Sequence, residues 1–149
     1  MLSITGQVVI DNSVYCKLFL DEAGRDKAVK FISYLNDKDI EILMPSLFMA
    51  EFLSVIRYKN IDFDTAYNFV SKQLELNMRI VADNKTTAHK ALEISHTGNK
   101  NSGFPSIYDA GYHALAIVND CWFITADSKY YSKTKQLGNI KLLEDLAIN

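Results

Sequence analysis

The sequence has no surplus of basic residues. Its 149 residues include sixteen Lys and Arg against eighteen Asp and Glu, which gives a formal net charge of −2. This balance excludes a basic stripe large enough to show in the total, which is the simplest sign of nucleic-acid binding. Long hydrophobic runs are also missing, because segments such as 110–118 fall well short of the roughly 20 residues of a membrane helix. We therefore expect no association with a membrane.

Cysteine and glycine are scarce, with two and six copies. Cys16 and Cys121 are far apart and form no CxxC pair, which excludes a zinc knuckle and a disulfide framework. Two lone cysteines in apolar surroundings indicate buried thiols in a reducing cytosol, so a cytoplasmic protein is expected. The start of the chain has no basic opening before an apolar stretch, so no secretory signal is expected. The glycines form neither GxGxxG nor GxxxxGKS, which gives no support for a nucleotide-binding loop.

Short apolar runs alternate with longer segments at helical spacing. This alternation predicts an α/β fold with a parallel sheet covered by helices, in one domain that spans residues 1–149. The expected strands are 7–10, 42–44, 78–81, 121–125 and 140–143. The segment 97–103 is rich in turn-forming residues and is expected to be an exposed loop.

Helices are expected between these strands, at 14–20, 21–36, 46–59, from 62 or 64 onward, 84–96, 106–120 and 128–136. Ser46 is the expected N-cap of the third helix, and Asp62 or Asp64 that of the fourth. In the fourth helix, an apolar side is formed by Phe63, Tyr67, Val70 and Leu74.

Two carboxylates stand directly after expected strands. Asp11 follows the first strand and Asp127 follows the fourth, at the edge where α/β sheets bind ligands. Each residue also suits the N-cap of the helix that follows it, and for Asp11 taken alone capping is the simpler interpretation.

Two further carboxylates stand in apolar helices. Glu51 interrupts a largely apolar stripe, and Asp109 is the only formally charged residue within 101–119. Because burying an unpaired charge is costly, each carboxylate needs a cation, a metal or a proton. An ion pair of Glu51 with Arg57 or a lysine is an alternative, as is a helix-dipole contact or a His113 contact for Asp109.

Two strand ends and two helices can deliver these four carboxylates to one crevice. At close range they would repel one another unless cations lay between them. Oxygen ligands select hard ions such as Mg²⁺ or Mn²⁺, and the lack of a nearby cysteine or paired histidine argues against zinc. Sites of this kind typically act on phosphate esters.

Four segments carry a family resemblance: Val8-Val9-Ile10-Asp11-Asn12-Ser13, Ala50-Glu51, Tyr108-Asp109-Ala110-Gly111-Tyr112-His113-Ala114-Leu115-Ala116 and Phe123-Ile124-Thr125-Ala126-Asp127. The third segment matches the pattern YDAxYxALA, and the fourth ends a strand in T-A-D. With them the chain, from about residue 8 to 143, resembles the PIN domain family, specifically the VapC-type toxin ribonucleases of toxin–antitoxin pairs.

The resemblance implies a PIN-like three-layer sandwich, with a central parallel sheet of about five strands flanked by helices. It implies an endoribonuclease that depends on Mg²⁺ or Mn²⁺ and hydrolyses RNA. By this resemblance the catalytic metal ligands are Asp11, Glu51, Asp109 and Asp127, and the groups that orient metal-bound water or a ligand carboxylate are Ser13 and Thr125. It also implies a cognate antitoxin and a homodimer. His113 stands at a variable position of the pattern and is expected to pack or to lie at the surface rather than to bind metal.

A basic run follows Asp127. Lys129 and Lys133 are candidates for RNA contact, and a solvated helix face is an equally good interpretation. Tyr130, Tyr131 and Phe104 are candidates to stack on bases, although aromatic residues at such spacing more often belong to a core. The loop 97–103 is a candidate border of the substrate channel.

Three alternatives stay open. The first is a non-catalytic PIN-fold module that binds RNA or protein, and the second is another Mg²⁺-dependent α/β phosphoesterase. The third is a metal-independent ribonuclease that uses His89, His96 and His113. The ends of the products separate the two nuclease mechanisms, because attack by water leaves a 5′-phosphate whereas attack by the 2′-hydroxyl leaves a cyclic phosphate.

Overall fold

Five strands form one parallel sheet in the computed structural model, which describes residues 3–148. The strands are β1 (Gln7–Ile10), β2 (Glu41–Pro45), β3 (Met78–Val81), β4 (Trp122–Thr125) and β5 (Ile140–Leu142). Each lies within one residue, at either end, of the strand expected from the sequence. Central strands of a parallel sheet are buried on both faces and therefore stand out in a sequence as short apolar runs.

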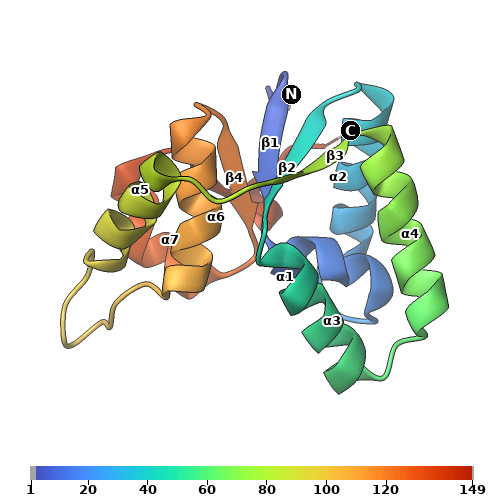
Figure 1. The fold of residues 1–149 in the computed structure, drawn as a ribbon, viewed down its shortest axis with the longest axis horizontal. Coiled ribbons are helices and arrows are strands. Elements are labelled where there is room, and N and C mark those ends of the chain that lie inside the picture. The colour runs from blue at the N-terminus through green and yellow to red at the C-terminus, as the bar shows by residue number, and fades with distance from the viewer. Residues whose placement is uncertain (1–2, 149) are drawn as a thin grey trace.

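Helices cover both faces of this sheet. They are α1 (Asn12–Tyr15), α2 (Arg25–Asp37), α3 (Phe48–Lys59), α4 (Phe63–Leu76), α5 (Lys85–Ser95), α6 (Ile107–Val118) and α7 (Ser128–Thr134). Short 3₁₀ segments lie at Cys16–Phe19 (η1), Lys135–Leu137 (η2) and Leu143–Asp145 (η3). Figure 1 shows α5 and α6 on one side of the sheet and α2 and α4 on the other. The expected three-layer α/β arrangement is confirmed.

The strand order β3-β2-β1-β4-β5 places a topological switch point beside β1. After β1, the chain forms β2 and then β3 on one side of β1. It then crosses to the other side of β1 and forms β4 and β5. At the junction of β1 and β4, Ile10 pairs with Ile124, and the N–H of Asp11 donates to the carbonyl of Ile124 at 2.9 Å. Ligands of open α/β sheets bind outside the carboxyl ends of the strands at such a point. Asp11 and Asp127 directly follow these two strands.

The core lies around the central strands. Val8, Val9 and Ile10 are fully buried, and α6 buries most of its length, including Tyr112 and His113. Both cysteines are buried free thiols, as the sequence indicates. Within residues 3–148 no helix has the length and apolar character to cross a membrane.

One expected helix cap is wrong and another is confirmed. Leu47 occupies the N-cap position of α3, and the hydroxyl of Ser46 instead donates to both carboxylate oxygens of Asp83 at 3.0 Å. For α4 the cap is Asp62, whose side chain accepts the N–H of Thr65 at 2.9 Å.

Helix α4 buries a narrower side than its apolar spacing suggests. Of the four apolar residues on the expected side, only Val70 is buried, and Phe63 is 48% exposed. The helix packs through Ala66, Val70 and Gln73. Gln73 is buried because its amide group bonds Asn36 and Asn77 and accepts from Tyr15. A polar residue thus takes a core position that the sequence pattern assigns to an apolar one.

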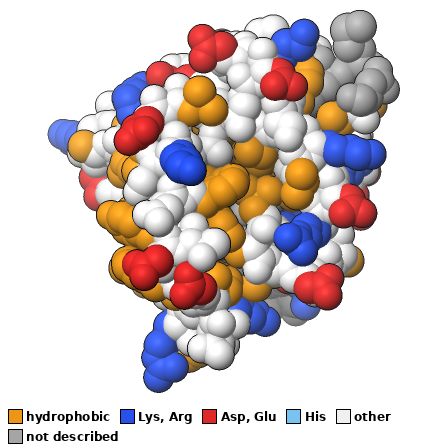
Figure 2. Space-filling model, turned by 90° about the vertical axis from the view of Figure 1, so that its right-hand side faces the viewer, with side chains coloured by type: hydrophobic (Ala, Val, Ile, Leu, Met, Phe, Trp, Pro, Cys, Tyr) orange, Lys and Arg blue, Asp and Glu red, His pale blue; other side chains and the backbone are white. Residues whose placement is uncertain are grey.

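The consequence is an apolar surface on α4. Five large side chains of this helix are exposed. Phe63, Tyr67 and Leu74 lie together on one side, and we call these three the α4 apolar face, whereas Phe69 and Leu76 lie beyond the packed residues on another side. Figure 2, which views the molecule from the right-hand side of Figure 1, shows hydrophobic side chains gathered across a hollow on this side. Surfaces of this kind commonly mark contacts with a partner.

Candidate metal centre

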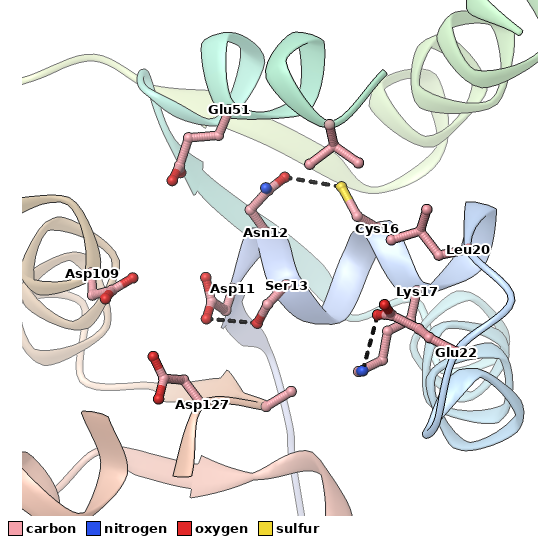
Figure 3. Close-up of a pocket in the computed structure, with 12 residues that line it drawn as sticks. Asp11, Asn12, Ser13, Cys16, Lys17, Leu20, Glu22, Glu51, Asp109 and Asp127 are labelled. Atoms are coloured by element: carbon pink, nitrogen blue, oxygen red, sulfur yellow. Dashed lines mark hydrogen bonds and ion pairs between the residues drawn. The ribbon is translucent and has the colours of Figure 1, made fainter. Parts of the chain in front are cut away.

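A cavity of about 430 Å³ lies at the carboxyl ends of β1 and β4, and we call it the carboxylate pocket. Its lining includes all four acidic residues singled out in the sequence: Asp11, Glu51, Asp109 and Asp127. They come from the β1–α1 junction, α3, α6 and the turn after β4. Figure 3 shows their carboxylates directed toward one shared space. The structure therefore brings together residues that lie as much as 116 positions apart in the sequence, from position 11 to position 127.

Asp11 is the most buried of the four, with 6% of its surface exposed. Its Oδ2 atom accepts hydrogen bonds from Ser13 Oγ and from Thr125 Oγ1, both at 2.8 Å. Although Asp11 stands at the N-cap position of α1, its side chain makes no capping hydrogen bond to that helix. Burial raises the pKa of Asp11, the two hydroxyls oppose this rise, and the charge of Asp127 adds to it. Ser13 and Thr125 thus hold the carboxylate at the pocket.

Glu51 has a hydroxyl partner rather than a cationic one. The hydroxyl of Tyr112, on α6, donates to Glu51 Oε1 at 2.8 Å. Within residues 3–148 no Lys or Arg forms an ion pair with Glu51, so the ion-pair interpretation is wrong. Burial raises the pKa of Glu51, the Tyr112 hydroxyl lowers it, and the charges of Asp11 and Asp109 raise it further.

Asp109 is fixed at the start of α6. Its Oδ2 atom accepts from the hydroxyl of Ser106 at 3.1 Å, and that hydroxyl in turn accepts the N–H of Asp109 at 3.1 Å. Burial, together with the charges of Asp11 and Asp127, raises the pKa of Asp109 to about 6. The expected alternative contact with His113 is not formed, because both ring nitrogens of that histidine have other partners.

Asp127 has two roles in the structure. Its Oδ1 atom caps α7 by accepting the N–H of Tyr130 at 3.0 Å, and the residue also lines the carboxylate pocket. Thr125 connects it to Asp11, because Thr125 Oγ1 accepts the N–H of Asp127 at 3.0 Å and donates to Asp11. The capping interpretation of Asp127 is therefore confirmed alongside its place in the pocket.

The donor set fits a hard divalent cation by its chemistry. Four carboxylates line one pocket, and the pKa values of Asp11, Glu51 and Asp109 are raised by burial and by the charges of other carboxylates of this pocket. A bound cation would relieve this repulsion, and oxygen donors suit Mg²⁺ or Mn²⁺. Considering residues 3–148, no three Asp, Glu, His or Cys side chains are grouped tightly enough to enclose one ion. The carboxylates surround the pocket without closing on a single point.

The two lysines proposed for RNA contact lie differently. Lys133 is near the α5–α6 loop, since a Cβ atom added at Gly103 would lie 3.3 Å from its Nζ, and its charge lowers the pKa of Asp109. Lys129 is exposed on α7 and is not part of the pocket lining. Of these two residues, only Lys133 acts electrostatically on the pocket.

The aromatic and histidine candidates are mostly structural. Tyr130 is 3% exposed, and its hydroxyl bonds His113 Nδ1 at 2.9 Å, so it is not available for base stacking. Phe104 remains exposed. His113 is fully buried, as its expected packing role requires, and none of His89, His96 and His113 lines the carboxylate pocket.

Sequence reasoning missed two features of the pocket. Tyr112 was not recognised as the partner of Glu51, although it stands three positions after Asp109 and therefore on the same helix face. Lys17 also lines the pocket, where it pairs with Glu22, and no local sequence pattern marks it.

Comparison with known proteins gives one family and several structures. The family model described as PIN domain matches residues 8–136. A search of curated protein sequences gives no match. VapBC2 from Rickettsia felis, solved with a DNA fragment from its promoter, is similar at a TM-score of 0.66 and 12% identity, covering 91% of this chain and 96% of that one.

Two further solved structures show the same likeness. FitAcB from Neisseria gonorrhoeae gives a TM-score of 0.65 at 14% identity, covering 93% of this chain and 99% of that one. VapC20 from Mycobacterium tuberculosis, described as a sarcin-ricin loop cleaving toxin, gives 0.64 at 14% identity, covering 84% and 93%. At such low identity these structures show a shared fold.

Proposed function

The chain belongs to the PIN domain family, and from this premise we propose that it is a metal-dependent endoribonuclease, the toxin of a toxin–antitoxin pair. The observation that carries the proposal is the carboxylate pocket itself. Four acidic side chains from four separate elements line one cavity at the switch point of the sheet. Clustered carboxylates with raised pKa values do not stabilise the fold of a metal-free protein, so a ligand-binding role accounts for them best.

In the proposed mechanism, Asp11, Glu51, Asp109 and Asp127 hold Mg²⁺ or Mn²⁺. When bound, the ion supplies positive charge that activates water toward a phosphodiester and stabilises the charge that develops on the phosphate and on the leaving oxygen. The protein prepares the ligands. Ser13 and Thr125 restrain Asp11 by hydrogen bonds to Oδ2.

The other three ligands follow a shared pattern. Each of Glu51, Asp109 and Asp127 has one oxygen held by a hydrogen bond, from Tyr112, Ser106 and the N–H of Tyr130 respectively. Within residues 3–148 their second oxygens accept no hydrogen bond. Each carboxylate is therefore oriented and keeps an oxygen for a cation.

The test is RNA cleavage by the purified chain. We predict that it cleaves RNA with Mg²⁺ or Mn²⁺, leaves 5′-phosphate and 3′-hydroxyl ends, and stops when EDTA is added. Asp109→Asn is expected to lower the rate by at least about 100-fold while the far-UV circular dichroism is unchanged, because the amide is a much poorer ligand for a hard cation. Asp64→Asn, on the exposed surface of α4, is the matched control and should cleave as the wild type does.

Four outcomes would contradict this proposal in different ways. Undiminished cleavage in EDTA would remove the metal mechanism, and cyclic phosphate ends would favour attack by the 2′-hydroxyl. A folded chain that binds RNA or antitoxin but never cleaves would support the non-catalytic module. Cleavage of small phosphomonoesters without cleavage of RNA would favour another phosphoesterase.

The proposed partners are an antitoxin and a second copy of this chain. The solved structures with the same fold include "Toxin-antitoxin complex from Klebsiella pneumoniae" and the VapBC2 assembly. We propose that the antitoxin covers the α4 apolar face, because apolar side chains of this size are seldom left together in water without a partner. RNA and an RNA-directed toxin meet in the cytoplasm, which is the proposed location. A homodimer is proposed from family membership alone.

A further inference from the structure

We propose that Lys17 binds a phosphate of the RNA strand next to the phosphate that is cleaved, and that the strand leaves the carboxylate pocket past Lys17 toward Lys27. This inference rests on the proposed function. It assigns a substrate contact to a side of the pocket that the four carboxylates do not occupy.

Among residues 3–148, Lys17, on η1, is the only basic side chain in the lining of the carboxylate pocket. Figure 3 shows Lys17 and Glu22 on the side of the pocket away from Asp109. The Lys17 side chain is only 14% exposed, whereas lysine side chains usually extend into solvent. The fold therefore places a fixed positive charge beside a cluster of carboxylates.

The ammonium group of Lys17 is held by hydrogen bonds that use two of its three N–H donors. A lysine ammonium has three N–H donors. One donates to the carbonyl of Ala23 at 2.8 Å and another to Glu22 Oε1 at 3.1 Å. Within residues 3–148 the third donor has no partner. A phosphate oxygen arriving there would meet a donor whose position is already fixed, which lowers the entropy cost of binding.

A second cavity continues from the first. It measures about 340 Å³ and shares Lys17 and Ala126 with the carboxylate pocket, so the two adjoin. Lys27 also lines the second cavity, where its Nζ donates to the backbone carbonyl of Glu144. The path from the carboxylates through Lys17 to Lys27 thus presents two ammonium groups in succession, beside Glu22 and Glu144, to the sugar-phosphate backbone of an RNA strand.

Lysines consequently stand on two sides of the carboxylates. Lys133 lies next to Gly103 and acts on Asp109, on the opposite side from Lys17. A strand that crosses the pocket would have its central phosphate at the carboxylates and its flanking phosphates near Lys133 and Lys17. This arrangement suits single-stranded RNA, whose backbone is contacted phosphate by phosphate.

The competing explanation is that Lys17 and Glu22 only brace the turn between η1 and α2. Both explanations allow a loss of stability when Lys17 is replaced, but only phosphate binding alters the salt dependence of RNA affinity. The chain offers a matched control on α5, where Lys90 pairs with Glu93 at 2.8 Å away from both cavities.

The experiment measures binding of a fluorescently labelled single-stranded oligoribonucleotide to the full chain over a salt series. All variants carry Asp109→Asn to prevent cleavage, and Mg²⁺ is present. We expect Lys17→Gln to weaken binding about fivefold and to reduce the slope of log K against log salt by about 0.7, the value for one lost phosphate contact on a single strand. Lys27→Gln should act in the same direction, and Lys90→Gln should change neither quantity.

The outcomes separate this inference from the function on which it rests. If the Asp109→Asn chain binds no RNA and the wild type cleaves none, the proposed function fails and this inference with it. If RNA binds and Lys17→Gln keeps the parent affinity and slope, only the role of Lys17 is overturned. If Lys17→Gln does not fold, Lys27→Gln decides, because the proposed path predicts a reduced slope for this variant and the parent slope would overturn the inference.

Discussion

The hydroxyl of Tyr112 connects the core to the carboxylate pocket. Tyr112 is fully buried, its ring stacks on Phe123 at a centroid distance of 6.0 Å, and its hydroxyl donates to Glu51. The position of Glu51 is therefore set by a side chain anchored against β4. Groups that orient metal ligands in this way commonly change metal affinity when they are removed.

Tyr112→Phe should weaken Mn²⁺ binding about tenfold, because Glu51 loses the bond that fixes one of its oxygens. Isothermal titration of the chain with Mn²⁺ measures this directly, without reference to activity. Tyr108→Phe is the matched control, since Tyr108 lies on the same helix and is 62% exposed. Equal Mn²⁺ affinity in wild type and Tyr112→Phe would show that packing alone positions Glu51.

The candidate site could be predicted from the sequence to the extent that its residues break a local pattern. Glu51 and Asp109 stand out because each interrupts an apolar helix, and Asp11 and Asp127 because each ends an apolar strand. Lys17 and Tyr112 break no such pattern, since a lysine beside a turn and a tyrosine in a core helix are ordinary. Their places in the pocket depend on distances between elements, which a local pattern does not contain.

Strands are easier to predict than helix faces. The central strands have short apolar runs that leave one interpretation, whereas α4 has apolar residues on several sides and its spacing does not say which side meets the sheet. The packed side includes Gln73, whose burial depends on partners from α1, α2 and the turn after α4. A hydrogen-bonded polar core position of this kind is invisible to hydrophobic periodicity.

Helices α6 and α7 are joined through His113. Its Nδ1 bonds the hydroxyl of Tyr130 at 2.9 Å, and its Nε2 bonds the carbonyl of Gly138 at 2.8 Å. Because a carbonyl only accepts, Nε2 carries the proton and Nδ1 accepts from Tyr130 in the neutral ring. Burial lowers the pKa of His113 below its ordinary value of 6.5.

The lowered pKa of His113 predicts how the free energy of unfolding depends on pH. As the pH falls below about 6.5, the unfolded chain takes up a proton on His113 while the folded chain does not, so the free energy of unfolding decreases toward the lowered pKa. Asp109 acts in the opposite sense, because its raised pKa lets the folded state bind a proton more readily than the unfolded state between about 6 and 3.8. The contribution of His113 must therefore be isolated by substitution.

Urea unfolding of wild type and His113→Gln, with EDTA present, provides that comparison. The variant should be less stable at neutral pH by about 1 to 3 kcal/mol, since a buried hydrogen-bonded side chain is replaced. The difference should narrow as the pH falls from about 6.5 to 5. A difference between wild type and His113→Gln that stays constant with pH would contradict this account.

Four of the eighteen acidic side chains of the molecule direct their carboxylates into one pocket. The four pocket carboxylates account for the acidic total, because without them fourteen acidic residues face sixteen basic ones. The sequence excludes a large basic face, and the structure has instead a few lysines around an acidic pocket. Its RNA affinity should accordingly depend on the divalent cation, whose charge reverses the local field.

The α4 apolar face lies on a different surface from the carboxylate pocket. If the antitoxin covers this face, charged substitutions there should separate inhibition from catalysis. Tyr67 and Leu74 are 41% and 38% exposed, so Lys at either position leaves the core intact. The double variant Tyr67→Lys, Leu74→Lys should cleave RNA as the wild type does.

The same double variant should resist its antitoxin. Burial of the exposed part of these two side chains contributes about 2 kcal/mol to binding, so affinity should fall by about 30-fold. Titration of antitoxin into the RNA cleavage reaction measures this as a shift in the inhibitory concentration. Leu92→Lys, an exposed apolar position on α5, is the control for added charge and should be inhibited normally. Normal inhibition of the double variant would place the antitoxin on another surface, whereas loss of cleavage without antitoxin would show that α4 supports the pocket itself.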